Sequence, residues 1–197
     1  MTFNKLNIKI DKPGTTLCAL ILASTMLLTS CWFNPAWLST ALADLPVLVE
    51  MAQAIAQIVA VTSTTNPATP QEVAAINQIG SVATQGLTAI DNLYLSYSKA
   101  DPTTTITQIQ TAGEALIVNL QQLLAAAQIK DPALLGRVTA AVQLIIGSLH
   151  TFLDLLPHVV TKSSLKAAAK AASTANLPKP KDLRQMWQQQ VGFALHK

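Results

Sequence analysis

Charged side chains are scarce in this chain: they make up 12% of its residues, against roughly 25% in an average soluble domain. Aromatic residues make up only 5%, so the 50% of residues that are hydrophobic are mainly aliphatic. Disorder throughout would need low hydrophobicity or high net charge, and is therefore excluded. The 2 cysteines and 7 glycines exclude a disulfide scaffold, a cysteine-based zinc site and a glycine-rich architecture. The whole chain of 197 residues is long enough for one domain with appendages.

Catalytic and metal-binding patterns are also missing. The chain contains no Glu-x-x-His, no His-Glu-x-x-His, no glycine-rich phosphate loop and no nucleophile elbow. One set of ligand-type residues has helical spacing, namely His150, Asp154 and His158. Three ligands in one line along a helix do not surround an ion, and Pro157 interrupts that line. We therefore treat this set as a weak candidate and predict no metal, no cofactor and no enzymatic activity.

The N-terminal segment has the parts of an export signal. Three lysines precede an uncharged, mainly aliphatic run over residues 15–28. That run is shorter than the roughly 20 apolar residues that a membrane span needs. The sequence Leu28-Thr29-Ser30-Cys31 follows at once and resembles a lipobox, the cleavage site of bacterial lipoprotein precursors. The resemblance implies that residues 1–30 are removed, that Cys31 is acylated, and that membrane lipid is thereby a partner.

Three aromatic residues follow the predicted lipidation site: Trp32, Phe33 and Trp37. Tryptophan favours the headgroup region of a bilayer, so these are candidate membrane-interface residues, with packing on the folded domain as the alternative. Trp32 occupies the position after Cys31, where an acidic residue would oppose transport to an outer membrane. We therefore expect the protein to reside in the outer membrane if the host has one. Two other outcomes stay open: secretion after Ala43, which ends a small-x-small pattern, and an uncleaved signal that anchors the chain.

The central part, residues 45–157, is predicted to be an all-α antiparallel up-down four-helix bundle, joined to Cys31 by a tether over 31–44. Its first helix is expected over 45–62, with Asp44 as cap and Pro46 in the first turn. Thr69-Pro70-Gln71-Glu72 is a capping box that starts the second, and Asp-Pro pairs at 101–102 and 131–132 start the others. Apolar residues recur at alternating spacings of three and four in each helix. The predicted stripes of the last three are Val73, Ile76, Gly80, Ala83, Leu87, Ile90, Tyr94 and Tyr97; Ile106, Ile109, Gly113, Leu116, Leu120, Leu123 and Ala127; and Leu135, Val138, Val142, Ile145, Leu149, Phe152 and Leu156.

The C-terminal tail, residues 158–197, has the opposite charge balance to the bundle. It holds seven cations against one acid, whereas residues 31–157 hold three against eight. A short amphipathic helix is expected to end it, capped by Asp182, with Leu183, Trp187, Val191 and Ala194 on its apolar side and Met186 and Phe193 near the edges. The candidate basic surface comprises Lys162, Lys166, Lys170, Lys179, Lys181 and Arg184.

Three fates of the tail stay open: binding to an anionic surface or an envelope protein, docking on the acidic bundle, and a solvated end. Nucleic acid is not expected for an exported chain. The sequence thus predicts a non-catalytic, membrane-tethered structural or interaction module of the bacterial cell envelope. Alternatives are a binding protein for an apolar small molecule or lipid, with room left by Gly80, Ala83 and Gly113 on the core stripes, and a membrane-active helical protein.

Overall fold

Helices account for all the regular structure in the described part of the chain. The computed structural model describes residues 36–62, 67–97, 102–156 and 178–195, all within the unit Pro35–Lys197. These residues contain no strand, and the predicted all-α class is confirmed. Cys31, the aromatic pair Trp32 and Phe33, and Lys162, Lys166, Lys170 and His158 lie outside the described residues. The described helices are α2 (Ala36–Ala54), α3 (Gln57–Thr62), α4 (Pro70–Ser96), α5 (Pro102–Ala126), α6 (Pro132–Asp154) and α8 (Pro180–Val191).

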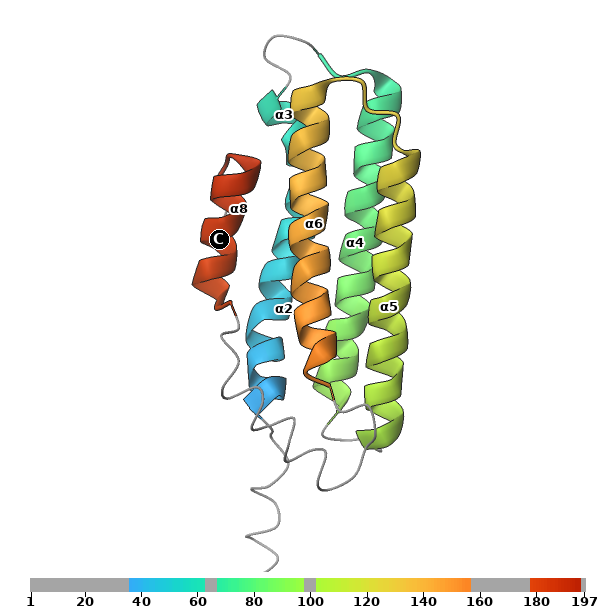
Figure 1. Ribbon diagram of the computed structural model, residues 1–197, viewed down its shortest axis with the longest axis vertical. Helices are drawn as coiled ribbons and strands as arrows, with labels where there is room; N and C mark the ends of the chain where they lie inside the picture. Colours follow the sequence, from blue (N-terminus) through green and yellow to red (C-terminus); the bar gives the residue numbers. More distant parts are fainter. Residues whose placement is uncertain (1–35, 63–66, 98–101, 157–177, 196–197) are drawn as a thin grey trace, which may run out of the picture. The chain divides into compact units, whose positions relative to one another are not determined.

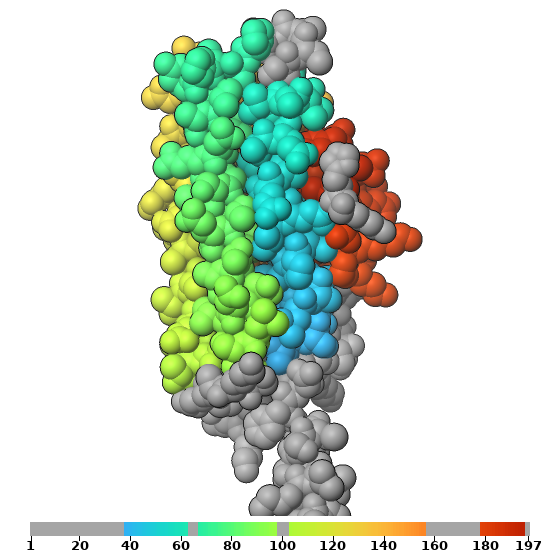
Figure 2. All heavy atoms as spheres, turned by 180° about the vertical axis from the view of Figure 1, so that it is seen from behind, coloured from blue at the N-terminus to red at the C-terminus, as the bar shows by residue number. Residues whose placement is uncertain are grey.

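The long helices α2, α4, α5 and α6 lie side by side with their axes roughly aligned, as Figure 1 shows. Helix α4 packs against α5 and α2, and α6 packs against α5 and α2 as well. The short helix α3 continues the direction of α2 and contacts α6. Helix α8 contacts both α2 and α6, so α2 lies between α4 and α8 in the space-filling view of Figure 2.

The first helix differs from our prediction. Helix α2 begins at Ala36, so Asp44 and Pro46 lie inside it, and the predicted cap and first-turn positions are wrong. Residues 36–44, which we expected to be a tether, are helical. Pro46 lies inside α2 and does not start it, because a proline is compatible with a first turn and is also tolerated inside a helix at a cost in hydrogen bonding. The helix is instead interrupted after Ala54 and resumes at Gln57, where Ile58 N–H donates to the Ile55 carbonyl at 3.1 Å.

The start of α4 is as predicted. Thr69 Oγ1 accepts from the Glu72 N–H at 3.3 Å, and Glu72 Oε2 accepts from the Thr69 N–H at 2.8 Å, which completes the capping box. The other oxygen, Glu72 Oε1, accepts from the Lys130 N–H at 2.7 Å and so ties this end of α4 to the connection before α6. These backbone donors lower the pKa of Glu72 to about 2.

The predicted stripe of α4 lies in the core from Ile76 to Tyr97, and only Val73 is partly exposed. Tyr94 and Tyr97 are each 3% exposed, as their predicted core positions require. Burial raises the pKa of both phenols. The stripe of α5 is also buried from Ile106 to Leu120.

In α6 the predicted stripe is wrong at its first position. Asp131 accepts from the N–H groups of Ala133 and Leu134, as a cap should. Leu134 is 2% exposed and Leu135 is 37% exposed, so the first core contact comes one residue earlier than predicted. A helix turns by 3.6 residues, and two adjacent leucines near its end fit an apolar stripe almost equally well. From Val138 to Leu156 the predicted positions are buried.

Small residues allow α2 and α4 to approach closely. A Cβ atom on Gly80 would lie 3.1 Å from the Ala52 carbonyl oxygen, which is backbone and has no freedom to move away. A Cβ on Gly113 in α5 would lie 2.8 Å from Leu153 Cδ2 of α6. The space beside both glycines is therefore occupied by a neighbouring helix.

Candidate interaction site at helix α8

Helix α8 has clear start and stop signals in the sequence. Pro180 occupies its first position, where a missing N–H costs nothing. Asp182 is not the cap that we predicted: Lys179 holds that position, and Asp182 Oδ2 accepts from the Lys179 N–H at 3.1 Å. Gly192 ends the helix with φ of +92°, a left-handed conformation that favours glycine.

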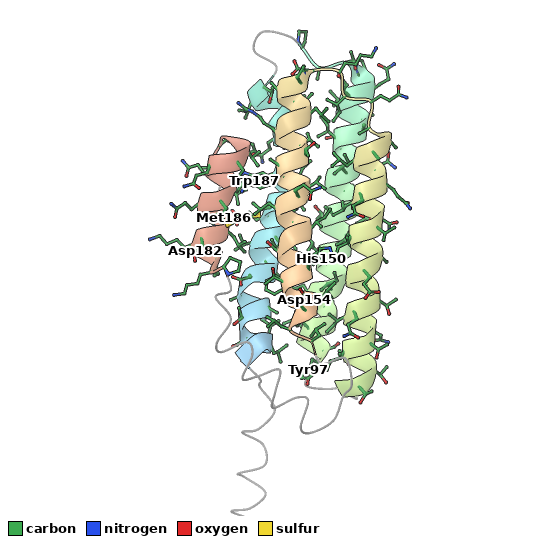
Figure 3. The ribbon with its side chains drawn as sticks, viewed as in Figure 1. Tyr97, His150, Asp154, Asp182, Met186 and Trp187 are labelled. Carbon is green, nitrogen blue, oxygen red and sulfur yellow. The ribbon has the colours of Figure 1, made fainter. Side chains whose placement is uncertain are left out.

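The apolar side of α8 is fully buried. Leu183, Trp187 and Val191 are each 0% exposed, as the predicted amphipathic pattern requires. Figure 3 shows the Trp187 side chain directed from α8 toward the neighbouring helices. The Trp187 ring packs edge-on against Phe193 at 5.8 Å and 87°. Ala194 is exposed, contrary to prediction, because the helix stops at Val191.

One ion pair joins α8 to α2. Arg184 Nη2 donates to Glu50 Oε2 at 2.7 Å, with side chains 37% and 21% exposed. Of the three fates left open for the tail, the structure has its last helix docked on α2, which carries Asp44 and Glu50, and on α6. Asp182 lies near Asp44, and Arg184, further along α8, pairs with Glu50, further along α2, so α8 and α2 run in the same direction.

Buried polar atoms without partners gather where α2, α6 and α8 meet. Within the described residues, all the buried side-chain polar atoms that lack a hydrogen-bond partner come from these three helices. An unsatisfied buried donor or acceptor costs about 1–3 kcal/mol, so this seam is less favourable than its apolar area implies. The atoms are both carboxylate oxygens of Asp44, Glu50 Oε1, Arg137 Nη1, Arg184 Nε and Trp187 Nε1.

Asp44 is the most unusual member of this group because its side chain is 0% exposed. Burial, and to a smaller extent the nearby charge of Asp182 on α8, raises the pKa of Asp44 from 3.8 to about 6. The seam therefore places two acids together at the start of α8. Lys179 and Lys181 of the same turn are exposed.

A shallow groove of about 320 Å³ runs between α6 and α8. It contains no ionisable side chain, and the hydroxyls of Ser148 and Thr151 already donate to the backbone carbonyls of Leu144 and Gly147. The groove thus offers shape and weak polar contacts but no reactive group. It is lined by Gln143, Leu144, Gly147, Ser148, Thr151, Pro178, Met186 and Gln190.

The remaining predicted site residues do not assemble into a site in the described part of the chain. Trp37 lies in the first turn of α2, and its side chain is outside the description. His150 and Asp154 are exposed along α6, where Figure 3 labels them. In the described ranges no group of three or more His, Cys, Asp or Glu side chains is placed to hold a metal ion.

Sequence reasoning missed the acids of α2. Leu38, Ala41, Leu45 and Leu48 follow the core spacing, and Asp44 falls beside them on the buried side of the helix. A carboxylate inside an apolar stripe was the available signal, and our placement of Asp44 as a cap concealed it. Glu50 gave no signal, because its partner Arg184 lies far along the chain.

One helix in the described part of the chain, α6, is long and apolar enough to cross a membrane. Half of its apolar window is buried against the other helices, as in the core helix of a soluble bundle, so its composition alone is weak evidence for a span. Comparison with protein-family models, curated proteins and solved structures gives no match.

Proposed function

We propose that this chain is a non-catalytic lipoprotein of the bacterial cell envelope, which serves as a structural or interaction module held at a membrane surface. The observation that carries the proposal is the lipobox-like Leu28-Thr29-Ser30-Cys31 directly after an uncharged aliphatic run. Several acyl chains on one cysteine hold a protein on a bilayer firmly, because each buried methylene contributes about 0.8 kcal/mol.

The start of α2 supports a short tether. The helix begins at Ala36, five residues after Cys31, and five extended residues span roughly 17 Å. The helical unit would therefore sit close to the bilayer. Acylation at Cys31 thus presents the unit at the membrane surface.

We further propose that α2, α4, α5 and α6 form an antiparallel up-down four-helix bundle. Short connections join successive helices, and such connections favour antiparallel neighbours. A rigid bundle without a reactive cluster suits a scaffold or docking role. The alternative of a ligand held in the core has less support, because neighbouring helices fill the space beside Gly80 and Gly113.

The direct test is the intact mass of the natively expressed protein after extraction from membranes. The proposal predicts a chain that starts at Cys31 and carries acyl chains. A chain that starts at Asp44, or the full chain, would overturn it.

A Cys31→Ala variant provides the matched fractionation test. The proposal predicts that this variant leaves the membrane fraction after a salt wash, whereas Ser30→Ala, which keeps the cysteine, does not. Retention of Cys31→Ala in the washed membranes would show that something other than the lipid holds the protein.

A further inference from the structure

Helix α8 combines a strongly apolar side with a cationic start. The apolar side consists of Leu183, Trp187 and Val191, all fully buried against α2 and α6. The first turns carry Lys179, Lys181 and Arg184 against the single acid Asp182. This pairing of an apolar stripe that includes tryptophan with flanking cations is typical of helices that lie in the interface of an anionic bilayer.

When α8 is docked, three polar groups of this seam lack hydrogen-bond partners, and a lipid surface or water would supply those partners. Trp187 Nε1 and Arg184 Nε have no partner in the seam, and Asp44 beneath α8 has none for either oxygen. At a bilayer interface the indole N–H meets headgroups and water, and a guanidinium binds phosphate with two parallel hydrogen bonds. Release of α8 also returns Asp44 to water.

The chain geometry permits the exchange. In Figure 1, α2 begins and α6 ends at the same end of the helical unit. A stretch of 21 residues, 157–177, connects α6 to Pro178 before α8, and this length spans up to about 70 Å when extended. A helix on this connection reaches a membrane plane near the start of α2.

We propose that α8 is a releasable helix that exchanges its site on α2 and α6 for an anionic lipid surface. This inference rests on the proposed function, which brings the membrane within reach, and deepens it by naming the surface and the segment that contact each other. Cys31 gives permanent attachment, and α8 adds a reversible contact that depends on lipid charge. When α8 leaves, the acidic seam of Asp44 and Glu50 is uncovered at the membrane.

The test uses Trp187 as a depth probe. The processed protein has Trp32 and Trp37 replaced by phenylalanine, so that Trp187 is the single tryptophan, and is mixed with brominated lipid vesicles. Because Trp187 is 0% exposed when docked, bromine quenches it only after α8 leaves the seam. Circular dichroism checks that the variant with a single tryptophan stays folded. If it does not, the quenching of Trp187 is obtained as the difference in fluorescence quenching between the wild type and Trp187→Phe.

We expect quenching with brominated phosphatidylglycerol vesicles and none with brominated phosphatidylcholine. Absence of quenching on phosphatidylglycerol overturns the proposal, and so does equal quenching on both lipids. Lys179→Gln and Lys181→Gln should weaken the vesicle interaction about fivefold each, because both side chains are exposed and each contributes attraction near the surface.

Asp44→Asn tests the seam itself. Removal of the buried charge favours the docked helix, so quenching at neutral pH should fall, whereas Glu114→Gln, an exposed acid on α5, should leave it unchanged. Unchanged quenching in Asp44→Asn would contradict the role of the seam. The experiment also separates the two proposals: a native protein acylated at Cys31 with Trp187 unquenched refutes release alone, and a native protein that carries no acyl chains but whose Trp187 is quenched refutes the anchor alone.

Discussion

The two faces of helix α2 are built in opposite ways. Toward α4 it presents small and aliphatic side chains, and Gly80 lets the partner backbone approach the Ala52 carbonyl closely. Toward α8 it presents Asp44 and Glu50, and the buried polar atoms there lack partners. In our proposal the same helix therefore has one permanent face, packed on α4, and one replaceable face, where the buried polar groups are only partly compensated.

The largest expected effect is on the free energy of unfolding, when the same leucine truncation is made in α4 and in α8, the helices that pack on the two faces of α2. Leu87 in α4 and Leu183 in α8 are both 0% exposed, and a buried Leu→Ala change usually costs about 2–5 kcal/mol. We expect Leu87→Ala to lower the free energy of unfolding by this amount in urea titrations followed by circular dichroism. Leu183→Ala should shift the bundle transition far less, because α8 separates before the bundle unfolds. Equal shifts would contradict the distinction between the faces.

Asp44→Asn should remove most of the pH dependence of α8 docking. The folded pKa of Asp44 is raised from 3.8 to about 6, so the native state holds this proton over a range where the unfolded chain has lost it. The contribution of Asp44 to stability is therefore largest below about pH 4 and is lost as the pH rises to about 6. The full loss corresponds to about 3 kcal/mol at most. Thermal melts from pH 4 to pH 8 measure it, and a slope in Asp44→Asn as steep as in the wild type would refute this origin.

Gly80→Val should force α2 and α4 apart. A Cβ at this position meets backbone at 3.1 Å, and overpacking of a core costs about 1–3 kcal/mol. Gly136→Val on α6 is the matched control, because no atom lies within 4 Å of its Cβ position. Urea unfolding of both variants tests the contact, and a loss for Gly136→Val equal to that for Gly80→Val would mean that helix propensity, not the close approach, sets the cost.

The smallest expected effect belongs to the ion pair between Arg184 and Glu50. Both side chains are partly exposed, so solvent screens the pair and its net contribution is about 0.5 kcal/mol. A double-mutant cycle with Arg184→Gln and Glu50→Gln measures this coupling. A coupling above about 2 kcal/mol would show that the pair, and not the apolar side of α8, holds the helix in place.

Much of the helical core could be predicted because its signals are local. The alternating spacing from Ile76 to Tyr97 and the Thr69 capping box depend only on neighbouring residues. The start of α2 was missed because Pro46 is compatible with a first turn and with a helix interior. Only the place of Asp44 within an apolar stripe was a local signal of the polar seam; its partners were not predictable, because Asp44 meets Asp182, and Glu50 meets Arg184, only after the chain has folded.

Native-state hydrogen exchange tests the central distinction most directly. Helix α8 has 12 residues, too few for a stable isolated helix, so its amides exchange when it leaves the seam. We predict that α8 exchanges through local opening with a free energy well below that of global unfolding, while the α2 amides beside α4 exchange only by global unfolding. If both segments exchanged with the same free energy, α8 would be part of the permanent core and the account would be wrong.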